Sequence, residues 1–91
     1  MNDLFEKVGK PPSGKMLELA RWCRDRGYVK TSDVVEWGTE NFYVSALRAA
    51  CLLAERGFLR RLNDDEVKSK FGHELGQGVW VATDLLRRLR S

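Results

Sequence analysis

The stretch that decides the fold runs from Thr31 to Leu62 and reads TSDVVEWGTENFYVSALRAACLLAERGFLRRL. Thr31 or Ser32 is a suitable N-cap, because a side-chain oxygen at that position accepts a backbone N–H from the first helical turn. The residues that follow predict a short helix that ends at Trp37. Gly38 is expected to supply the turn, since glycine ends a helix in the left-handed conformation at little steric cost.

A second, longer helix is predicted over residues 41–56, with Thr39 or Asn41 as its N-cap. Most of its side chains are apolar, so it should be buried around most of its circumference. Its few polar residues fall on one narrow stripe: Asn41, Ser45, Arg48 and Glu55. Leu52 falls in the gap of that stripe, where an exposed leucine would indicate a partner surface.

Two strands are predicted after Gly57, over residues 58–62 and 79–82, and they are expected to pair antiparallel. The connection between them is longer than most hairpin loops, which indicates a functional segment, and DEVKSKF within it could form a helical turn. Thr83 then caps a final short helix. The apolar stripe of that helix consists of Leu85, Leu86 and Leu89.

One more helix is predicted before the deciding stretch, over residues 14–26, with Ser13 as its N-cap and Gly27 as its end. Its buried side has the i, i+3, i+4, i+7 spacing and consists of Met16, Leu19, Ala20 and Cys23. Paired prolines precede this helix and break any continuation. The sequence therefore predicts an N-terminal arm over residues 1–12 and a single domain over residues 13–91.

Composition narrows the class of protein. The 91 residues carry a net charge of +3, which permits nucleic-acid binding without requiring it. Most of the cations are arginine, whose planar guanidinium suits phosphate and guanine. No apolar run approaches the roughly 20 residues that cross a bilayer, and the N-terminus does not read as a signal peptide. We expect a cytoplasmic protein without a membrane partner.

The order of these elements, together with VWVATDLL at residues 79–86, resembles the winged helix-turn-helix family, in particular small MarR-like and ArsR-like transcription regulators. The resemblance implies an α+β winged-helix fold with a three-helix core, a two- or three-stranded antiparallel wing and a short C-terminal helix. It also implies a DNA-binding transcriptional regulator, whose expected partners are double-stranded DNA and a second copy of the chain.

In this resemblance the helix over residues 41–56 enters the major groove with its N-terminal part. The residues expected at base edges are Thr39, Asn41, Tyr43, Ser45 and Arg48. Arg48 is best placed to form two hydrogen bonds with a guanine, whereas Asn41 either pairs with an adenine or only caps the helix.

Phosphate contacts are expected at two further places. One is the start of the preceding helix, where backbone amides add to the side chains of Lys30, Thr31 and Ser32. The other is the tip of the wing, with Lys68 and Lys70.

The wing departs from the family's pattern, because its acidic residues outnumber its two lysines. These acidic residues are Asp64, Asp65, Glu66 and Glu74. They could repel DNA or dock a protein. Together with Leu52 they favour an alternative: a winged-helix protein–protein interaction module within a larger assembly, which does not bind DNA.

The sequence allows two arrangements of the last helix. Its stripe, Leu85, Leu86 and Leu89, is expected to form a homodimer interface together with Leu4 and Phe5, or else the stripe packs within the chain.

The two cysteines also have two possible states. Cys23 and Cys51 lie in predicted helices with apolar neighbours, and are either two buried reduced thiols or a disulfide between helices that touch in the winged-helix core.

Enzymatic chemistry is not expected. The segment GKPPSGK at residues 9–15 has the spacing of a phosphate-binding loop, but Met16 stands where that loop needs a hydroxyl, and the prolines remove two backbone donors. The single histidine, His73, lies in the long loop. The paired ligand spacings of structural zinc motifs are missing. We therefore predict no catalytic residues, no metal, no cofactor and no small-molecule substrate.

Overall fold

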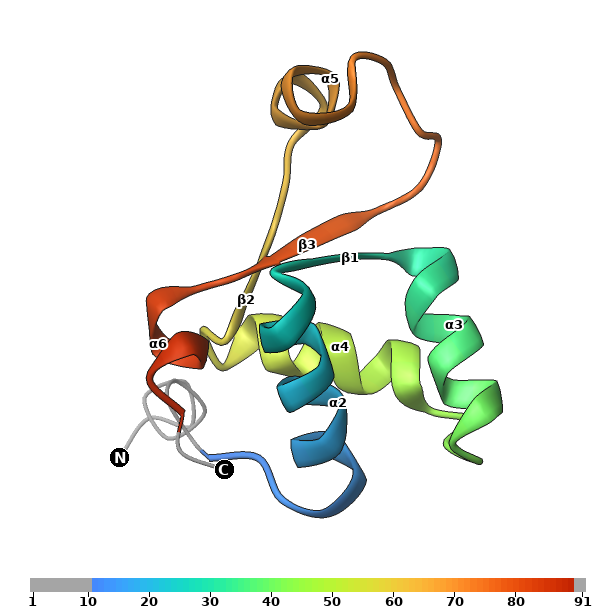
Figure 1. Ribbon diagram of the computed structural model, residues 1–91, viewed down its shortest axis with the longest axis vertical. Coiled ribbons are helices and arrows are strands. Elements are labelled where there is room, and N and C mark those ends of the chain that lie inside the picture. The colour runs from blue at the N-terminus through green and yellow to red at the C-terminus, as the bar shows by residue number, and fades with distance from the viewer. Residues whose placement is uncertain (1–10, 90–91) are drawn as a thin grey trace.

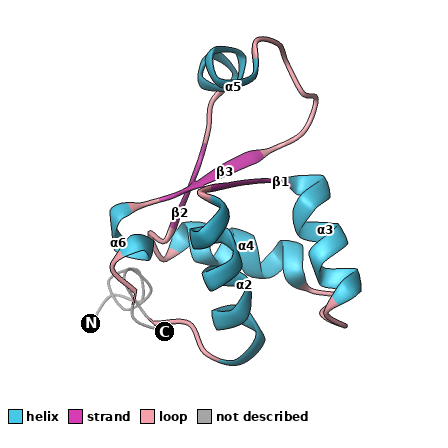
Figure 2. Cartoon of the chain, viewed as in Figure 1, coloured by secondary structure: helices cyan, strands magenta, loops and turns pink. Residues whose placement is uncertain are grey.

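The computed structural model describes residues 11–89 of the chain (Figures 1 and 2). Five helices and three strands occur in this part, and their order is α2 (Gly14–Arg26), β1 (Tyr28–Lys30), α3 (Thr31–Glu40), α4 (Ala46–Glu55), β2 (Leu59–Arg61), α5 (Asp64–Phe71), β3 (Val79–Ala82) and α6 (Asp84–Arg87). The α+β class expected from the sequence is confirmed. No helix among these is both long and apolar enough to cross a membrane.

The three strands form one antiparallel sheet in the order β1-β3-β2. Tyr28 of β1 and Arg60 of β2 are both in register with Val81 of β3. The predicted pairing of the two later strands is confirmed, and β1 adds the third strand. Figure 1 shows α2, α3 and α4 below the sheet, and α5 beyond it on the connection from β2 to β3.

The core lies between the sheet and these helices. Val29 and Trp80, which are paired in register, are buried against Leu19 of α2, Leu53 of α4 and Leu86 of α6. Along β1 only the central residue is buried, as expected where successive side chains of a strand point to opposite faces.

Helix α2 follows its sequence prediction. Ser13 is its N-cap, and Gly27 ends it at a φ of 81°. Leu19, Ala20 and Cys23 are buried as expected, and Met16 packs against the same core. The predicted arm over residues 1–12 lies almost entirely outside the described residues, as do Leu4 and Phe5, although Pro12 is buried.

The predicted boundary between the next two helices is wrong. Helix α3 begins after Lys30 rather than after a Thr31 or Ser32 cap, and it continues through Gly38 to Glu40. Helix α4 begins only after Ser45, five residues later than the predicted start of the helix over 41–56. The turn therefore lies after Gly38, and neither Thr39 nor Asn41 caps α4.

Gly38 serves a different purpose from the one predicted. A Cβ atom there would lie 2.6 Å from the backbone oxygen of Tyr43 and 2.8 Å from the Cβ of Ala46. The residue must be glycine because α3 and the start of α4 pass too close for any side chain, and not because a turn requires its backbone freedom.

The long connection in the wing contains a helix. The side chain of Asn63 accepts the N–H of Glu66, and Glu66 accepts the N–H of Asn63, so the pair forms a capping box at the start of α5. The three acidic residues of the first turn and the two lysines of the last turn both complement the helix dipole. The acidic character of the wing thus has a local structural reason. The helical turn expected for DEVKSKF is confirmed, and Lys68 and Lys70 lie on this helix.

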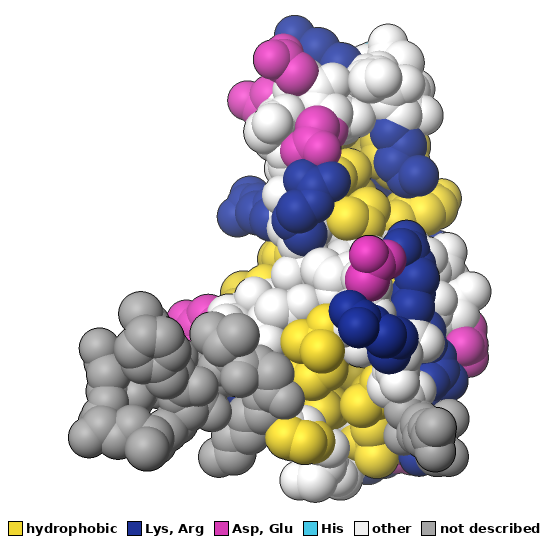
Figure 3. All heavy atoms as spheres, turned by 90° about the vertical axis from the view of Figure 1, so that its left-hand side faces the viewer, with side chains coloured by type: hydrophobic (Ala, Val, Ile, Leu, Met, Phe, Trp, Pro, Cys, Tyr) yellow, Lys and Arg dark blue, Asp and Glu magenta, His cyan; other side chains and the backbone are white. Residues whose placement is uncertain are grey.

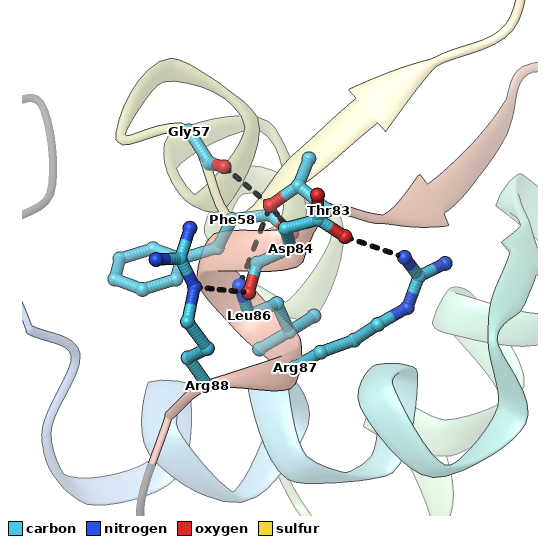
Figure 4. A network of polar contacts seen from close by, with 7 residues as sticks. All are labelled: Gly57, Phe58, Thr83, Asp84, Leu86, Arg87 and Arg88. Carbon is cyan, nitrogen blue, oxygen red and sulfur yellow. Dashed lines mark hydrogen bonds and ion pairs between the residues drawn. The ribbon is translucent and has the colours of Figure 1, made fainter.

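Hydrogen bonds of the Thr83 side chain join the start of α6 to the residues that follow α4 (Figure 4). The Thr83 hydroxyl donates to the backbone oxygen of Gly57 at 2.6 Å, and its oxygen accepts the N–H of Leu86 at 3.4 Å. Leu86 has no exposed surface, so its assignment to a dimer interface is wrong. Leu85 and Leu89 are partly buried against the same core. The stripe packs within the chain, because the sheet and α2 leave a gap that it fills.

Candidate functional site

Three large apolar side chains are exposed, and all of them lie where α3 meets α4. Val35 is 51% exposed, Phe42 93% and Val44 103%, within the residues that the structure describes. We call this region the α3–α4 surface, and it consists of Val35, Thr39, Phe42, Val44, Ser45 and Arg48. The sequence did not indicate Val35, Phe42 or Val44, because apolar residues within a predicted helix are expected to be buried.

The turn that presents these side chains is held by backbone hydrogen bonds. The N–H of Tyr43 donates to the oxygen of Gly38 at 2.7 Å, and the N–H of Phe42 donates to that of Thr39 at 3.4 Å. This is the Schellman arrangement that ends many helices. The accompanying apolar contact is also present, since the rings of Tyr43 and Trp37 meet edge to face with centroids 6.3 Å apart.

Phe42 occupies the position in this arrangement that glycine most often takes. Its φ is 56°, and it is the one residue other than glycine with a positive φ among those described. A side chain in the left-handed region costs roughly 1–2 kcal/mol. Because the ring is 93% exposed, burial of its apolar surface does not offset that cost. The ring therefore does little for the stability of the fold.

A hollow of about 180 Å³ lies between α3 and α4, beside these side chains. Its lining contains no charged group and consists of Val35, Thr39, Tyr43, Val44, Ala46 and Leu47. The carboxylates of α3 line a separate hollow, shared with α2, whose lining is Trp22, Arg26, Asp33, Glu36, Trp37 and Glu40. The two hollows beside α3 therefore differ in charge, since only the one shared with α2 has carboxylates in its lining.

Arg48 is the cation of this surface. It is exposed on α4, and its guanidinium has no hydrogen bond or ion pair with any residue between 11 and 89. Ser45, three residues earlier, is the exposed N-cap of α4, and its side chain makes no capping hydrogen bond. Both polar groups are therefore available to a ligand.

The other predicted base-reading residues are already engaged within the chain. The Thr39 hydroxyl donates to the oxygen of Val35 at 3.1 Å, and the Asn41 side-chain amide donates to the oxygen of Trp37 at 2.9 Å. The ring of Tyr43 is part of the contact that closes the turn. Of the two readings of Asn41, capping is the one found, but the helix that it caps is α3, at its C-terminus.

The backbone N–H groups at the start of α3 also form hydrogen bonds within the chain. The N–H of Thr31 donates to the oxygen of Gly78, and the N–H of Ser32 donates to the side-chain oxygen of Gln77 at 2.8 Å. The N–H of Lys30 donates to the carboxylate of Asp33 at 3.1 Å. The expected phosphate contact through these backbone amides is therefore wrong, and only side chains remain there for such a contact.

The wing lysines lie away from Arg48. Figure 1 places α5 at the opposite end of the molecule from the α3–α4 turn. Lys68 forms an ion pair with Glu74 at 3.3 Å, and the Lys70 ammonium lies 4.8 Å from the centre of the Tyr28 ring. Figure 3 shows basic and acidic side chains intermixed at this end. The predicted wing and helix residues do not form one basic patch.

Both cysteines are free thiols, so the reduced alternative is the one found and the disulfide is wrong. Cys23 is buried, and burial raises the pKa of its thiol from 9.0 to about 12. Cys51 is exposed, contrary to the expectation that both are buried. The exposed stripe of α4 runs through Arg48, Cys51 and Glu55, whereas Leu52 is partly buried.

The remaining features offer little chemistry. A hollow of about 260 Å³ in the wing places Arg61 near Asp64 and Glu74. Among residues 11–89, no group of three His, Cys, Asp or Glu side chains could hold a metal ion. His73 is exposed, with its Nδ1 atom 2.8 Å from the backbone oxygen of Glu74.

Comparison with known proteins adds no relative. No protein-family model, no curated protein and no solved structure matches this chain.

Proposed function

We propose that this protein is a transcription regulator of winged-helix type that binds double-stranded DNA through its α3–α4 surface. The observation that carries the proposal is Arg48: an exposed guanidinium on the first turn of α4, without a partner in the described part of the chain, three residues after the free hydroxyl of the N-cap Ser45. A guanidinium so placed suits the two acceptors of guanine in the major groove.

The arrangement of the elements supports the proposal. In a winged-helix protein, three helices and a small antiparallel sheet alternate in the order found for α2, β1, α3, α4, β2 and β3. By that correspondence α3 and α4 are the helix-turn-helix, and α4 is the helix that would enter the major groove. The connection from β2 to β3 is the wing, here with α5 inserted.

Two side chains at the start of α3 would add phosphate contacts. The backbone amides there are engaged, but the Lys30 ammonium and the exposed Ser32 hydroxyl are not engaged in the described residues. Such contacts position a protein on the duplex without reading sequence. Pairing of two copies on DNA remains part of the proposal, through a surface that does not include Leu86.

The test is a fluorescence-anisotropy titration of a mixed-sequence duplex at several salt concentrations, followed by selection of a preferred site. We expect the logarithm of the binding constant to fall linearly with that of the salt concentration. Arg48→Ala should weaken binding to the selected site about tenfold and reduce discrimination against other sequences.

Arg87→Ala is the matched control, because it removes the same charge from an arginine that is paired with Asp84 on α6. It should change affinity much less than Arg48→Ala does. Equal effects of the two substitutions would mean that only net charge matters, and would remove Arg48 from its proposed role.

A second function is favoured by one observation. The exposed side chains of Phe42 and Val44 would also suit an apolar partner protein. In that case the protein is an interaction module of a larger assembly, and no duplex should bind at low salt. The two surfaces that the sequence indicated for this role are weaker candidates. Leu52 is partly buried, three of the four acidic residues of the wing belong to the start of α5, and the fourth, Glu74, pairs with Lys68.

A further inference from the structure

We infer that Phe42 and Val44 read the 5-methyl groups of thymine in the major groove, next to the base contacted by Arg48. This inference rests on the proposed DNA binding and adds to it the chemical group that the turn before α4 recognises. It is carried by the exposure of the two side chains, by the conformation of Phe42 and by the charge of the surface around them.

The first step of the argument is that these side chains are not used by the fold. Phe42 and Val44 are almost completely exposed, so truncating either would remove no core contact. The Phe42 backbone is in the left-handed region, and the Schellman hydrogen bonds on either side keep it there. The turn therefore fixes the direction in which the Cα–Cβ bond of Phe42 leaves the backbone, and the ring lies in solvent.

The second step is position. Val44 immediately precedes Ser45, the N-cap of α4, and Arg48 lies on the first turn of that helix. In the proposed complex the start of α4 faces the base edges, so residues that immediately precede it reach the neighbouring base pairs. Arg48, Ser45 and Val44 then face successive stacked bases.

The third step is chemistry. The 5-methyl group of thymine is the apolar feature that a standard base pair presents in the major groove, and apolar side chains contact it. Val44 lines the uncharged hollow beside α3, which can accept such a group. A surface for a protein partner would need a larger continuous patch, whereas here the apolar side chains alternate with Thr39 and Ser45.

Charge also favours DNA as the occupant. The carboxylates of α3 line the hollow on its α2 side, so none lines the hollow beside Val44. The exposed cation that follows Val44 in the sequence is Arg48, on the first turn of α4. A thymine methyl group next to a guanine, on a duplex with an anionic backbone, complements an apolar side chain followed by a cation.

The experiment compares two versions of the duplex that the wild-type protein selects from a random library. One version contains thymine and the other contains uracil at every thymine, which removes the methyl groups and leaves the hydrogen-bonding pattern unchanged. We expect the wild-type protein to bind the thymine duplex about fourfold more tightly for each methyl group contacted, the value of one buried carbon.

Alanine variants test which side chains contact the thymine methyl groups. In Phe42→Ala and Val44→Ala the preference for thymine over uracil should fall toward one, because the contacting side chain is gone. In Arg48→Ala both affinities should fall while their ratio is kept. Val81→Ala, a partly buried valine of β3, is the control and should keep the wild-type ratio.

The outcomes separate this inference from the proposed function. Salt-sensitive binding with equal affinity for both duplexes, or a selected site without thymine, would overturn the inference and leave DNA binding in place. A preference that persists in both alanine variants would also overturn it, since the methyl contact would then lie elsewhere. Absence of any binding, even at low salt, would overturn the proposed function and the inference together.

Discussion

The turn between α3 and α4 and the wing between β2 and β3 are stabilised by different kinds of contact. At the turn, Gly38 allows close packing, backbone hydrogen bonds end α3, and the exposed side chains have few partners. In the wing, side chains cap α5, and ion pairs join Arg60 to Glu66 and Lys68 to Glu74.

This difference indicates which surface is available to a ligand. Two ion pairs join charges of the wing to one another, and Arg61 and Lys70 lie over aromatic rings, so a ligand there would compete with contacts that already exist. At the α3–α4 surface the Arg48 guanidinium and the apolar side chains are not engaged in the described residues. A surface whose groups are unpartnered in the free protein gains the most from a ligand.

The largest expected effect breaks the close packing at the turn. Gly38→Ala places a methyl group 2.6 Å from a backbone oxygen that cannot rotate away, so it should lower the free energy of unfolding by about 3 kcal/mol. Gly72→Ala in the wing is the control, because its Cβ would meet nothing within 4 Å and only the φ of 84° is strained. That change should cost about 1 kcal/mol. Urea denaturation measures both, and equal losses would contradict the role given to Gly38.

A smaller effect of opposite sign is expected at Phe42. Phe42→Gly relieves the left-handed strain and removes no buried contact, so it should raise the free energy of unfolding by about 0.5–1 kcal/mol after allowing for the greater freedom of glycine in the unfolded chain. Phe42→Ala keeps the strain and should change stability little. Thermal or urea unfolding compares the two, and a loss of stability in the glycine variant would show that the ring supports the fold.

The smallest effect concerns pH and belongs to the wing. Hydrogen bonds from the Arg60 side chain and from the N–H of Asn63 hold the pKa of Glu66 below its ordinary value of 4.5. Because the folded pKa is the lower one, Glu66 stabilises the fold above that ordinary value and loses its contribution as the pH falls through the folded pKa.

The check is the urea midpoint of the wild-type protein and of Glu66→Gln between pH 7 and pH 3. The difference between the two should be largest near neutral pH and should shrink below pH 4.5. Asp65→Asn removes one negative charge from the same turn of α5 and serves as the control. A difference that does not change with pH would contradict the role of the Glu66 carboxylate.

Local signals predicted much of the fold. Ser13 and Gly27 bound α2, Thr83 caps α6, and two short strand-forming runs after Gly57 predicted the pairing of β2 with β3. Each of these depends on a residue and its near neighbours in the chain, which is why sequence alone was sufficient. The candidate site was predicted less well, because the side chains of Thr39 and Asn41 are engaged within the chain, whereas Ser45 and Arg48 keep the free polar groups expected of them.

Only the tertiary structure decided which face of each helix is covered by another element. The sequence determined that glycine, aromatic and apolar residues gather between Trp37 and Leu47, but not that Gly38 would lie in a helix or that Val44 and Cys51 would be exposed. Residue type predicts burial only on average, since an apolar side chain is buried only where another element covers it. Here α2, α3 and the sheet cover one side of α4 and leave the other to solvent.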